Sequence, residues 1–192
     1  MLEKLLVSIV GGPWQLKLLC QKTSFPFIKR VLIIIYRYYN YRNNSSIAWN
    51  STFKGEPCFP HGWKSIFISG SAIFGSNCVI FQGVNVGSNN LPDSMGIGAP
   101  KIGSNCYIGA GAMIIGNVTI GNNCRIGANT VVYKNVPENS TVTSNKQTII
   151  CNNNRLNNKF YSFQNGKRVY FDNGKYVEEL DSNILKIFTD SR

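Results

Sequence analysis

The chain has 192 residues, of which 43% are hydrophobic, and a formal net charge of +11. This length suits one domain with terminal additions, and the charge suits a polyanionic partner: nucleic acid, anionic lipid, a phosphate-bearing cofactor or an acidic polysaccharide. The six cysteines form no C-x-x-C pair and follow no secretory signal, which argues against a disulfide framework or metal site and favours free thiols in the cytoplasm.

Three N-terminal segments, residues 1–10, 14–22 and 25–42, are predicted to be helical, with glycine and proline breaking the chain between them. Residues 1–45 hold seven basic residues against Glu3 alone. The longest apolar run is far shorter than the roughly 20 residues of a membrane span, so no crossing is predicted. We expect this helical segment to cap the following domain or to pack between subunits. The alternative is reversible contact with an anionic membrane surface, at its inner face.

Residues 68–137 repeat with a period of six, which is neither the period of a helix nor that of an alternating strand. The first position is always large and apolar: Ile68, Phe74, Ile80, Val86, Ile102, Ile108, Ile114, Ile120, Ile126 and Val132. The fourth position favours left-handed backbone: Asn77, Gly83, Asn89, Asn105, Gly111, Asn117, Asn123, Asn129 and Asn135. The fifth position is small or β-branched: Ala72, Cys78, Val84, Cys106, Ala112, Val118, Cys124, Thr130 and Val136. Short strands joined by tight corners, stacked about 4.8 Å apart, predict a parallel β-helix with the first and fifth positions inside.

The same interval continues backwards through Ile47, Phe53 and Phe59, so the β-helix is predicted to span residues 46–144. The step from Phe59 to Ile68 contains three extra residues, and the only histidine, His61, lies within it. Residues 88–101 add ten residues to one hexad and are rich in Gly, Pro, Asn and Ser, which predicts a loop that leaves the prism. We expect specificity to reside in this excursion.

The remaining residues, 145–192, form a predicted C-terminal extension. Residues 167–179 have the pattern of a β-hairpin turning at residues 172–174, and a short amphipathic stretch follows at 180–188. The sequence assigns no chemistry to this extension.

The segments PHGWKSIFISGSAIFGSNCVIFQGVNVGSNN (residues 60–90) and PKIGSNCYIGAGAMIIGNVTIGNNCRIGANTVVYKNVPENS (residues 100–140) carry a family resemblance. Over about residues 46–144 the chain resembles the serine acetyltransferase branch of the hexapeptide-repeat acyltransferases. The resemblance implies a mainly β fold, a left-handed parallel β-helix, assembled as a homotrimer. It also implies transfer of an acetyl group from acetyl-CoA, without a metal.

The resemblance further implies roles for individual residues. His61 occupies the place of the general base, which takes a proton from the acceptor hydroxyl. The implied acetyl-CoA contacts are Gly87, Ser88, Ala110, Gly111, Arg125, Ala128 and Lys134, although small corner residues are also what any repeat of this kind needs. Trp49, Trp63 and Asp93 are candidate acceptor-binding residues, the tryptophans as flat faces for sugar rings or else as buried contacts.

Three positions depart from the branch. Ser46 stands where the family has an orienting aspartate, and Pro60 replaces an acid directly before the base. Glu56, Asp93 or a backbone carbonyl, from this subunit or a neighbour, would then have to orient the imidazole. Ala99 replaces a histidine that holds serine, which favours a saccharide acceptor, such as a surface or capsular polysaccharide containing sialic acid.

Four other functions are weighed against this one. Serine O-acetylation and a non-catalytic β-helix scaffold stay open. A zinc enzyme with three histidine ligands is excluded because the chain has one histidine. A nucleic-acid-binding role is disfavoured because no reading motif accompanies the charge.

Overall fold

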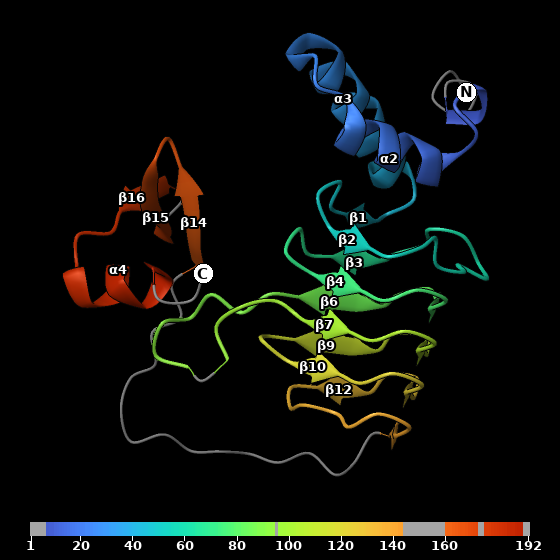
Figure 1. Ribbon diagram of the computed structural model, residues 1–192. Helices are drawn as coiled ribbons and strands as arrows, with labels where there is room; N and C mark the ends of the chain where they lie inside the picture. The colour runs from blue at the N-terminus through green and yellow to red at the C-terminus, as the bar shows by residue number, and fades with distance from the viewer. Residues whose placement is uncertain (1–6, 95, 144–159, 173–174, 190–192) are drawn as a thin grey trace.

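A computed structural model gives the architecture and describes residues 7–94, 96–143, 160–172 and 175–189 (Figure 1). Its centre is a stack of coils whose short parallel strands form three faces. Face A contains β1 (Ser46–Ile47), β3 (Phe67–Ile68), β6 (Asn85–Gly87), β9 (Met113–Ile115) and β12 (Val131–Val132). Face B contains β2 (Thr52–Phe53), β4 (Ile73–Phe74), β7 (Lys101–Ile102) and β10 (Thr119–Ile120). Face C contains β5 (Val79–Ile80), β8 (Tyr107–Ile108), β11 (Arg125–Ile126) and β13 (Thr141–Val142).

The interior of the prism confirms the hexad interpretation. Every predicted first-position and fifth-position residue is buried, including the thiols of Cys78, Cys106 and Cys124, which are free. Strands pair in register so that first-position residues stack, as Phe53 does on Phe74 with ring centroids 4.4 Å apart. The core is therefore a column of apolar side chains that extends through all the coils.

The three corners of the prism differ from one another. At corner BC, Asn77, Asn105 and Asn123 have φ of 54–58°, and their side-chain amides form a ladder with bonds of 2.8 and 3.2 Å. Corner CA also has left-handed residues at the fourth position, Gly83, Gly111 and Asn129.

Corner AB corrects the prediction. Its fourth-position residues Asn89, Asn117 and Asn135 do not have positive φ. Asn135 instead accepts a hydrogen bond from the Thr119 N–H at 2.8 Å, and Gly116 takes the left-handed conformation, φ 87°. The excursion leaves the prism at this corner, so the chain follows a different path there.

The N-terminal helices α2 (Pro13–Lys22) and α3 (Pro26–Arg42) cover the first coil, which confirms the cap (Figure 1). The Tyr36 hydroxyl donates to the Ile47 carbonyl at 2.8 Å, and the Ile47 N–H donates to Asn40 Oδ1 at 3.0 Å. The helices thus satisfy backbone groups that the open end of the β-helix would otherwise leave unpaired. Of the first predicted helix, residues 7–9 are helical and residues 1–6 lie outside the described part. No helix in the described ranges has the length and apolarity to cross a bilayer.

Lys17 is a buried cation between the cap and the first coil. Its side chain is 1% exposed, its Nζ donates to the Ser51 carbonyl at 2.6 Å, and it lies 5.1 Å from the centroid of the Phe53 ring. Burial lowers the pKa of Lys17 from the ordinary 10.5 to about 8. The unfolded chain therefore binds more protons than the folded one between these two values, and folding becomes more favourable as pH rises through that window.

We expect this linkage to show in a comparison of wild type with Lys17→Met. The unfolding free energy of wild type relative to the variant should rise by about 1 kcal/mol between about pH 7 and about pH 9, in urea titrations. Subtracting the unfolding free energy of the variant cancels the pH dependence contributed by other groups. Cys20 is one of them, since burial raises its pKa to about 11. A difference in unfolding free energy between the two proteins that stays constant over this pH range would contradict the buried position of the ammonium group.

The C-terminal extension forms an antiparallel sheet of β14 (Phe160–Gln164), β15 (Lys167–Asp172) and β16 (Lys175–Glu178), followed by α4 (Ser182–Thr189). The arms of the predicted hairpin, β15 and β16, are present, and residues 173–174 of its turn lie outside the described residues. β14 is an additional strand that the sequence did not predict. Asn90 of the excursion donates from Nδ2 to the Tyr161 carbonyl at 2.5 Å, which links the loop to this sheet (Figure 1).

Candidate active site

His61 lies on a tight turn at corner CA, between the Cys58 bridge to face C and β3 of face A. The Gly62 N–H donates to the Phe59 carbonyl at 2.9 Å, with Pro60 and His61 as the central residues. Proline suits the second position of such a turn, and Gly62 has φ 67°, which favours glycine. The side chain of His61 is exposed, so the turn presents an imidazole to solvent at a defined place.

Trp63 holds this turn from beneath. It is 4% exposed, and its ring meets those of Tyr36 and Tyr39 at 5.9 Å and that of Phe59 at 5.6 Å, all edge-on. The Ser45 hydroxyl donates to the Trp63 carbonyl at 2.9 Å. The prediction that Trp63 offers a flat face to a sugar is therefore corrected. The ring is buried and packs the turn against α3.

A groove runs from this turn along face C. The rings of His61 and Phe81 lie 5.8 Å apart, and those of Phe81 and Tyr107 4.9 Å apart. The groove has a volume of about 410 Å³ and is lined by Phe81, Tyr107, Gly109, Ala110, Arg125, Ile126, Gly127, Ala128 and Thr141. Because Tyr107, Arg125 and Thr141 are register partners on successive strands, the groove follows the axis of the β-helix.

The predicted donor-binding residues divide into two groups. Ala110, Gly111 and Ala128 lie at corner CA, the corner of His61, and Arg125 lies on face C beside them. Arg125 is the one cation among the described residues that line the groove, and its side chain is exposed. A small-residue channel with an arginine some coils away from an imidazole suits an extended ligand with a charged end.

The other predicted site residues lie at corner AB. Gly87 ends β6 and Ser88 follows it, Lys134 follows β12, Asp93 lies in the excursion, and Trp49 follows β1. Trp49 is half-buried with Lys29 Nζ 4.8 Å from its ring centroid, so one face of that ring is already occupied. A single chain does not bring this second group to His61, because the two corners lie on opposite edges of face A.

Within the described residues, the imidazole of His61 has no hydrogen-bond partner. Ser46 lies outward on β1, and both Glu56 and Asp93 are exposed. The expectation that an acid or a backbone carbonyl, from this subunit or a neighbour, orients the ring stays a prediction.

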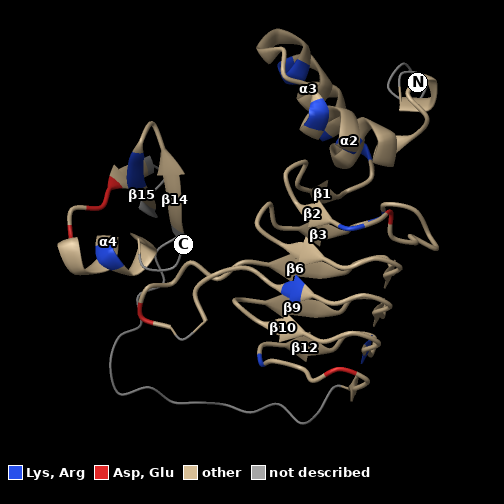
Figure 2. Ribbon diagram, in the orientation of Figure 1, with Lys and Arg blue, Asp and Glu red and all other residues tan. Residues whose placement is uncertain are grey.

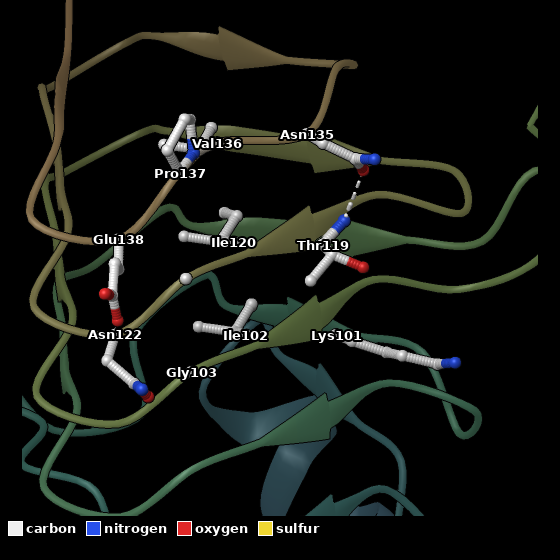
Figure 3. A pocket seen from close by; sticks show the side chains of 11 residues that line it. Lys101, Ile102, Gly103, Thr119, Ile120, Asn122, Asn135, Val136, Pro137 and Glu138 are labelled. Atoms are coloured by element: carbon white, nitrogen blue, oxygen red, sulfur yellow. Dashed lines mark hydrogen bonds between the residues drawn. The ribbon is translucent and has the colours of Figure 1, made fainter.

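Two other concavities accompany the groove. One, of about 610 Å³, adjoins the other side of the turn and is lined by Val7, Ser8, Gly11, Gly12, Pro13, Tyr39, Asn43, Gly62, Trp63 and Lys64. The larger one, of about 630 Å³, lies on face B, where Lys101, Thr119 and Asn135 project outward (Figure 3). It lies on a regular stretch of the repeat and has no imidazole among its described lining residues, so the groove beside His61 is the better candidate.

Residues 99–134 match the family described as bacterial transferase hexapeptide (six repeats). These residues therefore match transferase hexapeptide repeats. No curated protein sequence matches the chain.

Solved structures similar to this hexapeptide-repeat chain are serine acetyltransferases. The enzyme from Neisseria gonorrhoeae has a TM-score of 0.59 and 27% identity, over 69% of this chain and 52% of its own. A serine acetyltransferase in complex with CoA has a TM-score of 0.56 and 25% identity, over 67% and 52%. Isoform 3 from Entamoeba histolytica, in complex with cysteine, shares the fold at 23% identity, with a TM-score of 0.57 over 74% and 50%.

The chain spans about half the length of these relatives. The repeat match and the neighbours confirm the fold class, a left-handed parallel β-helix with N-terminal helices.

Sequence reasoning missed the aromatic part of the groove, Phe81 and Tyr107. Their signal was available: both follow or precede a first-position residue and therefore point outward, and face C repeats every third hexad once the excursion is removed. Aromatic residues that flank first-position residues on adjacent coils of one face indicate a lined surface.

Proposed function

We propose that this protein is an acetyl-CoA-dependent O-acetyltransferase with His61 as general base and a saccharide hydroxyl as acceptor. The observation that carries the proposal is the exposed imidazole at the end of the face C groove, next to the ring of Phe81. In this reaction the imidazole takes the hydroxyl proton as the oxygen attacks the thioester carbonyl. The new C–O bond forms, the C–S bond breaks, and CoA leaves as the thiol after the proton is returned to sulfur.

The groove accommodates the donor in the proposed mechanism. Gly109, Ala110 and Ala128 leave room for an extended chain, and Arg125 lies where a phosphate of CoA would be bound. The relative solved in complex with CoA supports this donor. The second concavity, on the other side of the His61 turn, is the candidate acceptor site, with Lys64 as a cation for an acidic sugar.

Serine is the second candidate acceptor because the structural neighbours are serine acetyltransferases, one of them in complex with serine. Ala99, in the excursion, argues for a saccharide because it cannot supply the imidazole that serine-specific relatives use there. Release of the CoA thiol should be followed with serine beside a panel of free and polymeric saccharides that includes sialic acids. Faster release with serine would overturn the saccharide assignment, and CoA binding without release on any acceptor would favour the scaffold.

The protein is further proposed to act as a homotrimer in the cytoplasm, with a composite site. Face A, which separates corners CA and AB, exposes Phe67, Met113, Ile115, Val131 and Tyr133, with 41–64% of each side chain accessible. Packing of this face would bring the Gly87, Ser88 and Lys134 corner of one subunit beside the His61 corner of the next. A neighbouring subunit could then also supply the group that orients the imidazole.

Val131→Glu tests this assembly. Val131 is 50% exposed on β12, the last strand of face A, so a charge there is tolerated in a monomer but strongly unfavourable in an apolar contact. We expect the mass measured by light scattering to fall from trimer to monomer and acetyl transfer to fall with it. Lys101→Glu, on face B, is the matched control and should leave the mass unchanged. A trimeric Val131→Glu protein would exclude face A as the contact.

A further inference from the structure

The outer surface of α3 carries an apolar stripe that the β-helix does not use. Its residues are Phe27, Val31, Ile34, Tyr38 and Tyr41, at intervals of four, three, four and three. This spacing places all five on one side of a helix, over a length of about 21 Å. They are 79%, 42%, 65%, 48% and 75% exposed, respectively, which is unusual for side chains of this size on one helix face.

The opposite side of α3 is already occupied. Tyr36 and Asn40 are buried there and bond the backbone of Ile47, and Tyr36 also meets the ring of Trp63. The stripe therefore does not contribute to the cap, and an outer partner is needed to account for it.

The charges beside the stripe indicate the chemistry of that partner. Arg30 and Arg37 follow one edge of the stripe, and Arg42 lies at the other edge on the last turn. Figure 2 shows Lys and Arg on α2 and α3 and no acidic residue on either helix. In the sequence no acid occurs between Glu3 and Glu56. Two copies of such a surface would place arginines together without acids to pair with them, whereas an anionic partner complements them.

We propose that the α3 stripe binds the surface of an anionic lipid bilayer. A helix that lies in the interface buries apolar and aromatic side chains at the level of the headgroups while flanking cations contact acidic lipids. Phe27 and Tyr41 at the two ends and Arg30 and Arg37 along the edge match this arrangement. Because Trp63 packs on α3, the contact also brings the His61 turn near the membrane, a consequence that rests on the proposed function.

Flotation of the full chain with vesicles tests the proposal. We expect the protein to float with phosphatidylcholine vesicles that contain phosphatidylglycerol and to stay behind with phosphatidylcholine alone. Ile34→Glu should reduce the bound fraction at least tenfold. The pair Arg30→Gln and Arg37→Gln should reduce affinity roughly 20-fold at low salt, with a smaller change at high salt. Leu180→Glu is the control because Leu180 is 80% exposed but lies in the C-terminal extension, and its binding should equal wild type.

Three outcomes would overturn the proposal: no flotation of wild type with acidic vesicles, equal flotation of Ile34→Glu, or a fall in oligomeric mass of Ile34→Glu without any lipid binding by wild type. The last would assign the stripe to a contact between copies. Circular dichroism of each variant checks folding, and the arginine pair keeps the test decisive if Ile34→Glu folds poorly. CoA binding is measured separately, so failure of lipid binding leaves the acetyltransferase proposal standing.

Discussion

Replacement of His61 by alanine is expected to slow acetyl transfer by about 10²- to 10⁴-fold in kcat/KM while CoA still binds. Positioned general bases contribute a factor of this size because the acceptor oxygen becomes nucleophilic only as it loses its proton. The chain contains no second histidine that could take over. Rates of CoA release with the best acceptor, and calorimetric titration with CoA, measure the two quantities.

The controls for this variant are set by the local structure. His61 is exposed and its described ring contact is with Phe81, so the variant should unfold at the wild-type temperature. Lys54→Ala removes an exposed side chain that lines neither the groove nor the concavity beside the turn, and it should retain both CoA binding and acetyl transfer. A His61→Ala protein that transfers acetyl at the wild-type rate would show that another group acts as the base.

Gly121→Ala is expected to destabilise the fold by about 3 kcal/mol. A Cβ added at Gly121 would lie 2.6 Å from Glu138 Cα and 2.9 Å from Glu138 Cβ. These atoms are the Cα and Cβ of a residue in the next coil, and rotation of a flexible side chain does not move them. The strain therefore cannot be relieved in that way.

Gly55→Ala is the matched control. There the nearest atom to an added Cβ is Ser76 Cβ at 3.7 Å, an ordinary contact, and the change should alter stability by less than about 0.5 kcal/mol. Urea titrations of both variants give the comparison. Equal midpoints for Gly121→Ala and wild type would mean that the coils are spaced more widely than the structure has them.

The contrast between glycines shows what a period of six can predict. The first and fifth positions were predictable because each is an inward side chain, and burial restricts it to apolar or small residues. The second-position glycines, such as Gly103 and Gly121, were not explained by sequence. Their φ is ordinary, and what excludes a side chain is the backbone of the following coil, which lies sequentially remote but spatially adjacent.

The candidate site was predictable where local sequence determines it. Pro60 and Gly62 indicate a turn around His61, and the turn is present. The burial of Trp63 was not predictable, because it depends on contacts with aromatic residues of α3. The separation of Gly87 and Ser88 from Ala110 and Ala128 was also hidden, since every hexad looks alike until the corners are assigned to faces.

The most direct measurement of the central claim is a crystal structure of the protein with CoA bound. The account predicts the pantetheine chain along Phe81, Tyr107 and Ala128, with the sulfur within reach of the His61 imidazole and a phosphate near Arg125. CoA bound on face B, or bound in the groove with its sulfur far from His61, would contradict it.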